Sequence, residues 1–111
     1  MKIGEKFKLS NAKIAKQDSR YVVKDNNILN NLVVSTTELQ PSCQTNGHSH
    51  KGQEEVYIFT RGSGRMEIDD ALFNVSAGDT LLIEDGAFHK VYNHGSEVLE
   101  FTRVFDGRRD H

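Results

Sequence analysis

Two histidines stand one residue apart in the stretch "GHSHKGQEEVY", which spans residues 47–57. Successive side chains of a β-strand alternate between its two faces, so His48 and His50 would project to the same side. A short turn at "KGQ" would then let Glu54 or Glu55 enter the next strand. Two imidazoles and a carboxylate are common ligands of divalent transition metals, so the stretch predicts half of a metal site.

A third nitrogen ligand would have to come from another part of the chain. The candidate is His89, which lies in "GDTLLIEDGAFHKVYN", residues 78–93. In this segment a glycine-containing turn delivers a histidine into a new strand.

The elements that would position these residues read as short strands. Residues 20–23 and 32–39 are rich in β-branched side chains, and the Asn/Asp cluster "KDNNILNN" separates them. Gly, Asp and Asn also separate the later candidate strands, at residues 56–61, 65–68, 72–75, 80–83, 89–93 and 98–105. This regular spacing predicts an all-β sandwich or barrel. One helix is expected, at residues 10–17, and "GSG" at residues 62–64 is expected to be a hairpin turn rather than a phosphate loop.

Length and composition limit the classes of protein to consider. With 111 residues, 36% of them apolar and 27% charged, we expect one soluble domain over residues 1–111. The apolar runs are too short to cross a bilayer, so no membrane partner is expected. A single cysteine and an N-terminal stretch without an apolar leader predict a cytoplasmic protein. Residues 1–24 carry seven Lys/Arg against two Asp/Glu, but the lysines are scattered without stacking aromatics, so no nucleic-acid partner is expected.

The spacing of the candidate ligands resembles the two conserved motifs of the cupin superfamily. The first block reads His48-x-His50-x4-Glu55-x6-Gly62, and the second reads Gly78-x5-Glu84-x-Gly86-x2-His89-x3-Asn93. The motifs cover about residues 47–62 and 78–93, with the short separation seen in compact single-domain microbial cupins. One position departs from the pattern, because Glu84 stands where the motif usually has proline. The turn there loses a preset φ but keeps an Asp-Gly pair.

The resemblance implies a double-stranded β-helix, or jelly-roll barrel, with one divalent metal held by His48, His50, Glu55 and His89. Of the two adjacent glutamates, only Glu55 lies at the motif's distance from Gly62. Such a set suits Fe, Mn, Ni, Co, Cu or Zn, and the ligand types alone do not choose among them. A six-coordinate ion would keep two positions open for water, dioxygen or a chelating substrate.

Strand alternation also predicts which side chains line a pocket beside the metal. Residues that share a face with a ligand are expected to surround a small polar molecule, with Arg103 in the last strand to hold an anionic group. These residues are Gln44 and Asn46 beside His48, Tyr57 and Phe59 beside Glu55, and Val91 and Asn93 beside His89.

Three functions follow from the resemblance. The first is a metal-dependent enzyme on a small polar metabolite, similar to the phosphosugar isomerases of the mannose-6-phosphate type, whose first motif also contains "GHSH". The second is a dioxygenase that uses Fe(II), and the third is a non-catalytic ligand-binding or sensor module. A homodimer is also expected, because Val56 and Ile58 lie on the strand face opposite Glu55 and need a partner surface.

Overall fold

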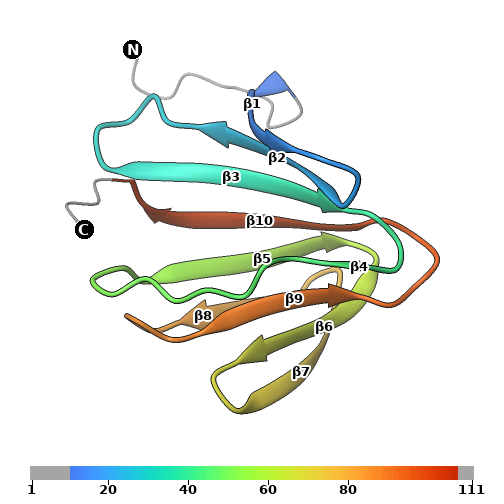
Figure 1. The fold of residues 1–111 in the computed structure, drawn as a ribbon. Helices are drawn as coiled ribbons and strands as arrows, with labels where there is room; N and C mark the ends of the chain where they lie inside the picture. Colours follow the sequence, from blue (N-terminus) through green and yellow to red (C-terminus); the bar gives the residue numbers. More distant parts are fainter. Residues whose placement is uncertain (1–10, 108–111) are drawn as a thin grey trace.

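The runs of β-branched and aromatic residues form ten strands in the computed structural model, which describes residues 11–107. The strands make two antiparallel sheets, and Figure 1 shows β3, β10 and β5 side by side across the middle of the molecule. The six-stranded sheet has the order β1 (Lys13–Gln17), β2 (Tyr21–Asn26), β3 (Leu32–Leu39), β10 (Leu99–Asp106), β5 (Glu55–Arg61) and β8 (Thr80–Ile83). The four-stranded sheet has the order β4 (Cys43–Gln44), β9 (His89–Asn93), β6 (Ser63–Ile68) and β7 (Ala71–Ser76). The all-β fold predicted from the sequence is confirmed.

The core lies between the two sheets. From Glu55 to Phe59 in β5, and throughout β9, every second residue is buried, beginning with Glu55 and His89 at the first position of each strand. The six-stranded sheet contributes large side chains such as Phe59 and Phe101, and the four-stranded sheet contributes Met66 among others. The strand alternation that packs this core therefore also turns Glu55 and His89 inward.

The outer face of the six-stranded sheet is apolar in one row of its register. Val34, Val104, Val56 and Leu82 are direct neighbours across β3, β10, β5 and β8. Leu82 is the most exposed large hydrophobic residue of the described chain, with 72% of its surface accessible. Val56 therefore lies on the outer face of the sheet, the face for which the sequence predicts a partner surface.

Two expectations about local structure are wrong. The helix expected at residues 10–17 is replaced by β1, which begins at Lys13 and pairs antiparallel with β2; long-range pairing here outweighs local preference. The "GSG" segment is not a hairpin turn, because β5 and β6 belong to different sheets. Gly62, with φ of 83°, bends the chain from one sheet to the other.

The sequence contains no apolar run long enough to cross a bilayer, and the helices of the structure can be compared with this prediction. Across residues 11–107, no helix is long and apolar enough to cross a bilayer.

Candidate metal centre

The segment between β4 and β5 meets the start of β9 at two of the histidines. His48 forms an isolated antiparallel bridge with His89, the first residue of β9. The His48 amide donates to the His89 carbonyl oxygen at 3.2 Å, and the His89 amide donates to the His48 carbonyl oxygen at 2.9 Å. This pair of backbone bonds fixes the two histidines opposite each other, so their side chains lie on one face.

Three of the four predicted ligands form a tight group. Ligand atoms of His48, Glu55 and His89 all lie within 4.8 Å of one another. The His50 ring lies beside this group, with its centroid 4.6 Å from that of His48 and 6.4 Å from that of His89. Glu54, the alternative carboxylate, is exposed, whereas Glu55 is 3% exposed. The structure therefore brings Glu55 rather than Glu54 to the histidines.

The buried atoms of this group fit a cation. Both carboxylate oxygens of Glu55 and the Nε2 atom of His89 are buried and have no hydrogen-bond partner. His89 Nε2 lies 3.8 Å from Glu55 Oε1, too far for a hydrogen bond. Buried polar atoms are normally hydrogen-bonded, so a close group of ligand atoms without hydrogen bonds indicates a missing ligand. A divalent transition metal would satisfy all three.

Backbone carbonyls hold the histidine rings in a metal-binding orientation. The Nδ1 atom of His48 lies 3.2 Å from the Asn46 carbonyl oxygen, and that of His89 lies 3.0 Å from the Ala87 carbonyl oxygen. An Nδ1–H that donates to a carbonyl leaves Nε2 as the free lone pair, the arrangement common among metal-ligating histidines. Burial, with the neighbouring His89, His50 and Arg103, lowers the pKa of His48 to about 4. His48 is therefore neutral at pH 7, as a ligand must be.

Hydrogen bonds between the two motifs hold the loop that carries His50. The Gly52 amide donates to Asp85 Oδ1 at 2.6 Å, and the Gly86 amide donates to the His50 carbonyl oxygen at 3.2 Å. The turn with Glu84 in the usual place of proline still closes, because the Ala87 amide donates to the Glu84 carbonyl oxygen at 3.0 Å. Gly86 supplies the positive φ, 78°, that this turn requires.

A cavity of about 470 Å³ opens beside the metal group. His48, His50, Tyr57 and Arg103 all line it. Arg103 shares the inner face of β10 with Phe101 and Phe105, so its direction, which the sequence left open, is toward the interior. Its Nη1 atom lies 3.5 Å from Glu55 Oε2, and its Nη2 atom donates to Ser35 Oγ at 3.3 Å. Burial raises the pKa of Tyr57 above its usual value, an effect that Arg103 partly offsets, so the phenol keeps its proton.

The other residues predicted to line the pocket fall into two groups. Asn46 lines the cavity with Tyr57 and Arg103. Phe59 and Val91 lie in the hydrophobic core, and Gln44 is exposed in β4. Asn93 is fully buried, where its side chain donates to the Leu39 and Glu97 carbonyl oxygens and accepts from the Gly95 amide. The structure places Phe59, Val91, Gln44 and Asn93 outside the cavity wall.

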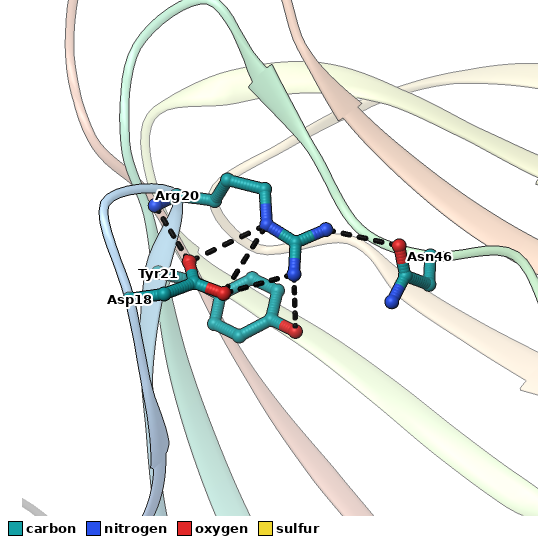
Figure 2. Close-up of polar contacts among 4 residues, drawn as sticks. All are labelled: Asp18, Arg20, Tyr21 and Asn46. Atoms are coloured by element: carbon teal, nitrogen blue, oxygen red, sulfur yellow. Dashed lines mark hydrogen bonds and ion pairs between the residues drawn. The ribbon is translucent and has the colours of Figure 1, made fainter.

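One wall of the cavity went unnoticed in the sequence. The β1–β2 hairpin contributes Lys16, Tyr21 and Asp25, and the only sequence signal was the β-branched run at residues 20–23. Figure 2 shows how the hairpin is tied to the segment that carries His48: the Arg20 guanidinium donates to both Asp18 carboxylate oxygens, to the Tyr21 hydroxyl and, at 2.9 Å, to Asn46 Oδ1. Asn46 also supplies the carbonyl oxygen that orients His48, so Arg20 is linked to a metal ligand through one residue.

Two facing antiparallel sheets, with a group of histidines and a glutamate able to hold a metal between them, define a small β-barrel protein of the jelly-roll class. The chain belongs to the cupin family, because residues 35–105 match the family's cupin domain. The resemblance of the two motifs is thereby confirmed.

Known proteins similar to this chain include two curated relatives and a solved structure. An uncharacterized protein of Methanocaldococcus jannaschii is 38% identical over 53 residues, 48% of this chain and 42% of that protein. The oxalate-binding protein of Thermotoga maritima is 30% identical over 67 residues, 60% of this chain and 55% of that protein. The chain thus spans about half the length of these relatives. The structure of KdgF from Halomonas is similar with a TM-score of 0.81 and 16% identity, covering 96% of both chains, which shows a shared fold.

Proposed function

We propose that this cupin is a metal-dependent enzyme that acts on a small organic acid. The observation that carries the proposal is the position of Arg103, whose guanidinium points into the cavity and lies 3.5 Å from the Glu55 carboxylate. A cation placed there is suited to hold a carboxylate that also reaches the metal. The metal ligands are His48, His50, Glu55 and His89, as the family motif implies.

Each residue of the site has a defined chemical task. Bound to these ligands, a divalent transition metal would polarise the carboxylate or carbonyl oxygen of the acid. Arg103 binds the anionic group, and the protonated Tyr57 phenol beside it offers a hydrogen-bond donor. The neutral imidazole of His48 adds no positive charge, so the positive charge beside the metal group comes from the metal and Arg103, with Lys16 on the β1 side of the cavity.

One relative and the charges of the cavity wall support an acid rather than a phosphosugar as the ligand. The Thermotoga maritima relative is named as an oxalate-binding protein, and oxalate is a small dianion able to chelate a metal. Phosphate groups are usually held by several basic side chains or by a helix N-terminus. In the described cavity wall the lysines and arginines are Lys16 and Arg103. An Fe(II) dioxygenase acting on such an acid is the alternative enzyme, and it uses the same ligands.

The test combines metal content with acid binding. Elemental analysis of tag-free protein should find near-stoichiometric metal in the wild type and little in His50→Ala and Glu55→Ala. Calorimetry of the metal-loaded protein should then show oxalate binding that weakens at least tenfold in Arg103→Met. Arg61→Met is the matched control, because Arg61 is an exposed residue at the end of β5. Equal, low metal in all three proteins would overturn the proposal, as would oxalate binding that Arg103→Met leaves unchanged.

A second candidate is a binding module without turnover, favoured by the similarity to the oxalate-binding protein of Thermotoga maritima. A panel of small hydroxy, oxo and dicarboxylic acids, incubated with each reconstituted metal, distinguishes the two. Turnover lost in Glu55→Ala, with correct folding retained, identifies an enzyme. Stoichiometric binding without consumption of any acid identifies a binding module.

A further inference from the structure

Asp25 lines the cavity from a strand that is three places away from β5, the strand of Glu55, in the six-stranded sheet. It lies on β2 and pairs with Ser35 on β3; Ser35 pairs with Arg103 on β10, and Arg103 pairs with Tyr57 on β5. The four residues therefore form one row across the inner face of the six-stranded sheet. Asp25, Arg103 and Tyr57 all line the same cavity. A carboxylate and a guanidinium thus face one cavity from two strands that are separated by β3.

One oxygen of this carboxylate lacks a partner. Asp25 Oδ1 is buried and has no hydrogen bond. Its register neighbour on β1, Lys13, is exposed and does not satisfy this atom. A buried acceptor without a donor destabilises the protein, and more so when it is charged. A donor group on a bound ligand would remove this destabilisation.

The spacing of the row sets the length of such a ligand. Neighbouring strands lie about 4.8 Å apart, so Asp25 and Arg103 are separated by about 10 Å at the backbone. A two-carbon acid bound at Arg103 and the metal is too short to reach Asp25. An acid with about four carbons in a chain extends far enough to place its other end at Asp25.

We propose that Asp25 selects the substrate class. The selected molecules carry a carboxylate at one end and a hydrogen-bond donor, either a hydroxyl or an ammonium group, at the other end. This inference rests on the proposed function, because Arg103 and the metal must hold the first carboxylate. A dicarboxylate of the same length would bring its second negative charge against Asp25. Like charges in a partly buried site disfavour binding strongly, so Asp25 excludes longer dicarboxylates while it accepts hydroxy and amino acids.

A matched pair of four-carbon acids tests the inference. Calorimetry of the metal-loaded protein measures the Kd of 4-hydroxybutyrate, succinate and oxalate for the wild type and for Asp25→Asn, which preserves size and removes the charge. The wild type should favour 4-hydroxybutyrate over succinate by at least tenfold. In Asp25→Asn this preference should fall at least tenfold, mainly because succinate binds more tightly. Asp70→Asn, at the exposed turn after β6, should change nothing.

The outcomes separate this inference from the proposed function. Oxalate bound equally by wild type and Asp25→Asn shows that the variant is folded and that the metal end is intact. If oxalate binds and the preference between the longer acids is the same in both proteins, Asp25 does not select the ligand. Failure of both longer acids to bind, with oxalate bound, also overturns the inference. If the metal-loaded wild type does not bind oxalate, the proposed function fails and the inference fails with it.

Discussion

Replacing Glu55 with glutamine tests whether this carboxylate is a metal ligand. In the metal-free protein two effects oppose each other: the ion pair with Arg103 at 3.5 Å is lost, but a buried charge whose two oxygens accept no hydrogen bond is removed. We expect the free energy of unfolding without metal to change by less than about 2 kcal/mol. Loss of a group that only supports a ligand commonly weakens metal binding about 10–100-fold, so loss of an anionic ligand should cost at least about 100-fold, or about 2.7 kcal/mol.

Thermal unfolding with and without metal measures this loss directly. For a domain of roughly 100 residues, 1 kcal/mol shifts Tm by about 4 °C or more, so the metal-induced rise in Tm should be about 10 °C smaller in Glu55→Gln than in the wild type. The comparison is made within each protein, between excess Co²⁺ and excess chelator, so that differences in metal-free stability cancel. Glu54→Gln, the exposed neighbour, should behave as the wild type. An equal metal-induced rise in the wild type and Glu55→Gln would refute the role of Glu55 as a ligand.

Three further substitutions test the fold, the outer face and the hairpin contact. Gly62→Ala should lower the free energy of unfolding in urea by about 3 kcal/mol or more, because Gly62 has a positive φ and a Cβ there would meet a backbone carbonyl. Gly78 also has a positive φ but faces open space, so Gly78→Ala should lower it by only about 1 kcal/mol. Equal losses in the two variants would contradict the close contact at Gly62. If the homodimer expected from the sequence uses the apolar outer face, Leu82→Asp should shift the mass measured by light scattering toward the monomer. Leu72 lies on β7 in the other sheet and is 55% exposed, so Leu72→Asp should leave the mass unchanged. A monomeric wild type would contradict the dimer. Arg20→Ala should weaken Co²⁺ binding about threefold in a chelator competition, since Arg20 holds the residue whose carbonyl orients the first histidine; unchanged affinity would show that this link is not energetically coupled.

The four-ligand set came from the resemblance to the cupin motifs, and strand alternation explains why two of its members, Glu55 and His89, face inward. Glu55 and His89 each begin a run of strand residues in which every second one is buried, so the rule that packs Phe59 and Val91 into the core also turns the two ligands inward. The same rule could not separate core from cavity. Phe59, Val91 and Asn93 share the ligands' faces, but they lie deeper between the sheets, and depth along a strand depends on how the two sheets meet.

Long-range pairing explains what the sequence did not reveal. The β1–β2 hairpin forms a cavity wall because β2 pairs with β3, and β1 consists of exposed residues without an apolar pattern. Asp25 therefore read as part of an Asn/Asp turn, although it lies within β2 and faces the cavity. The direction of Arg103 followed only from the register of β10 against β3 and β5. Asp25 and Arg103 are polar residues whose side chains lie on the inner face of a strand. This position can be recognised only when the neighbouring strands are known.

The contact between Arg103 and Glu55 implies an order of binding. Without metal, each of these side chains is the nearest opposite charge of the other, at 3.5 Å, so an incoming acid must compete with Glu55 for the guanidinium. A metal bound to Glu55 draws its negative charge away from Arg103 and adds positive charge beside it, and both changes favour an anion. We therefore expect oxalate to bind the chelator-treated wild type at least about 100-fold more weakly than the metal-loaded protein. In the metal-free state, Glu55→Gln should bind oxalate more tightly than the wild type, because the competing carboxylate is gone. The two calorimetric titrations check this order, and metal-free wild type that binds oxalate as tightly as the metal-loaded protein would contradict it.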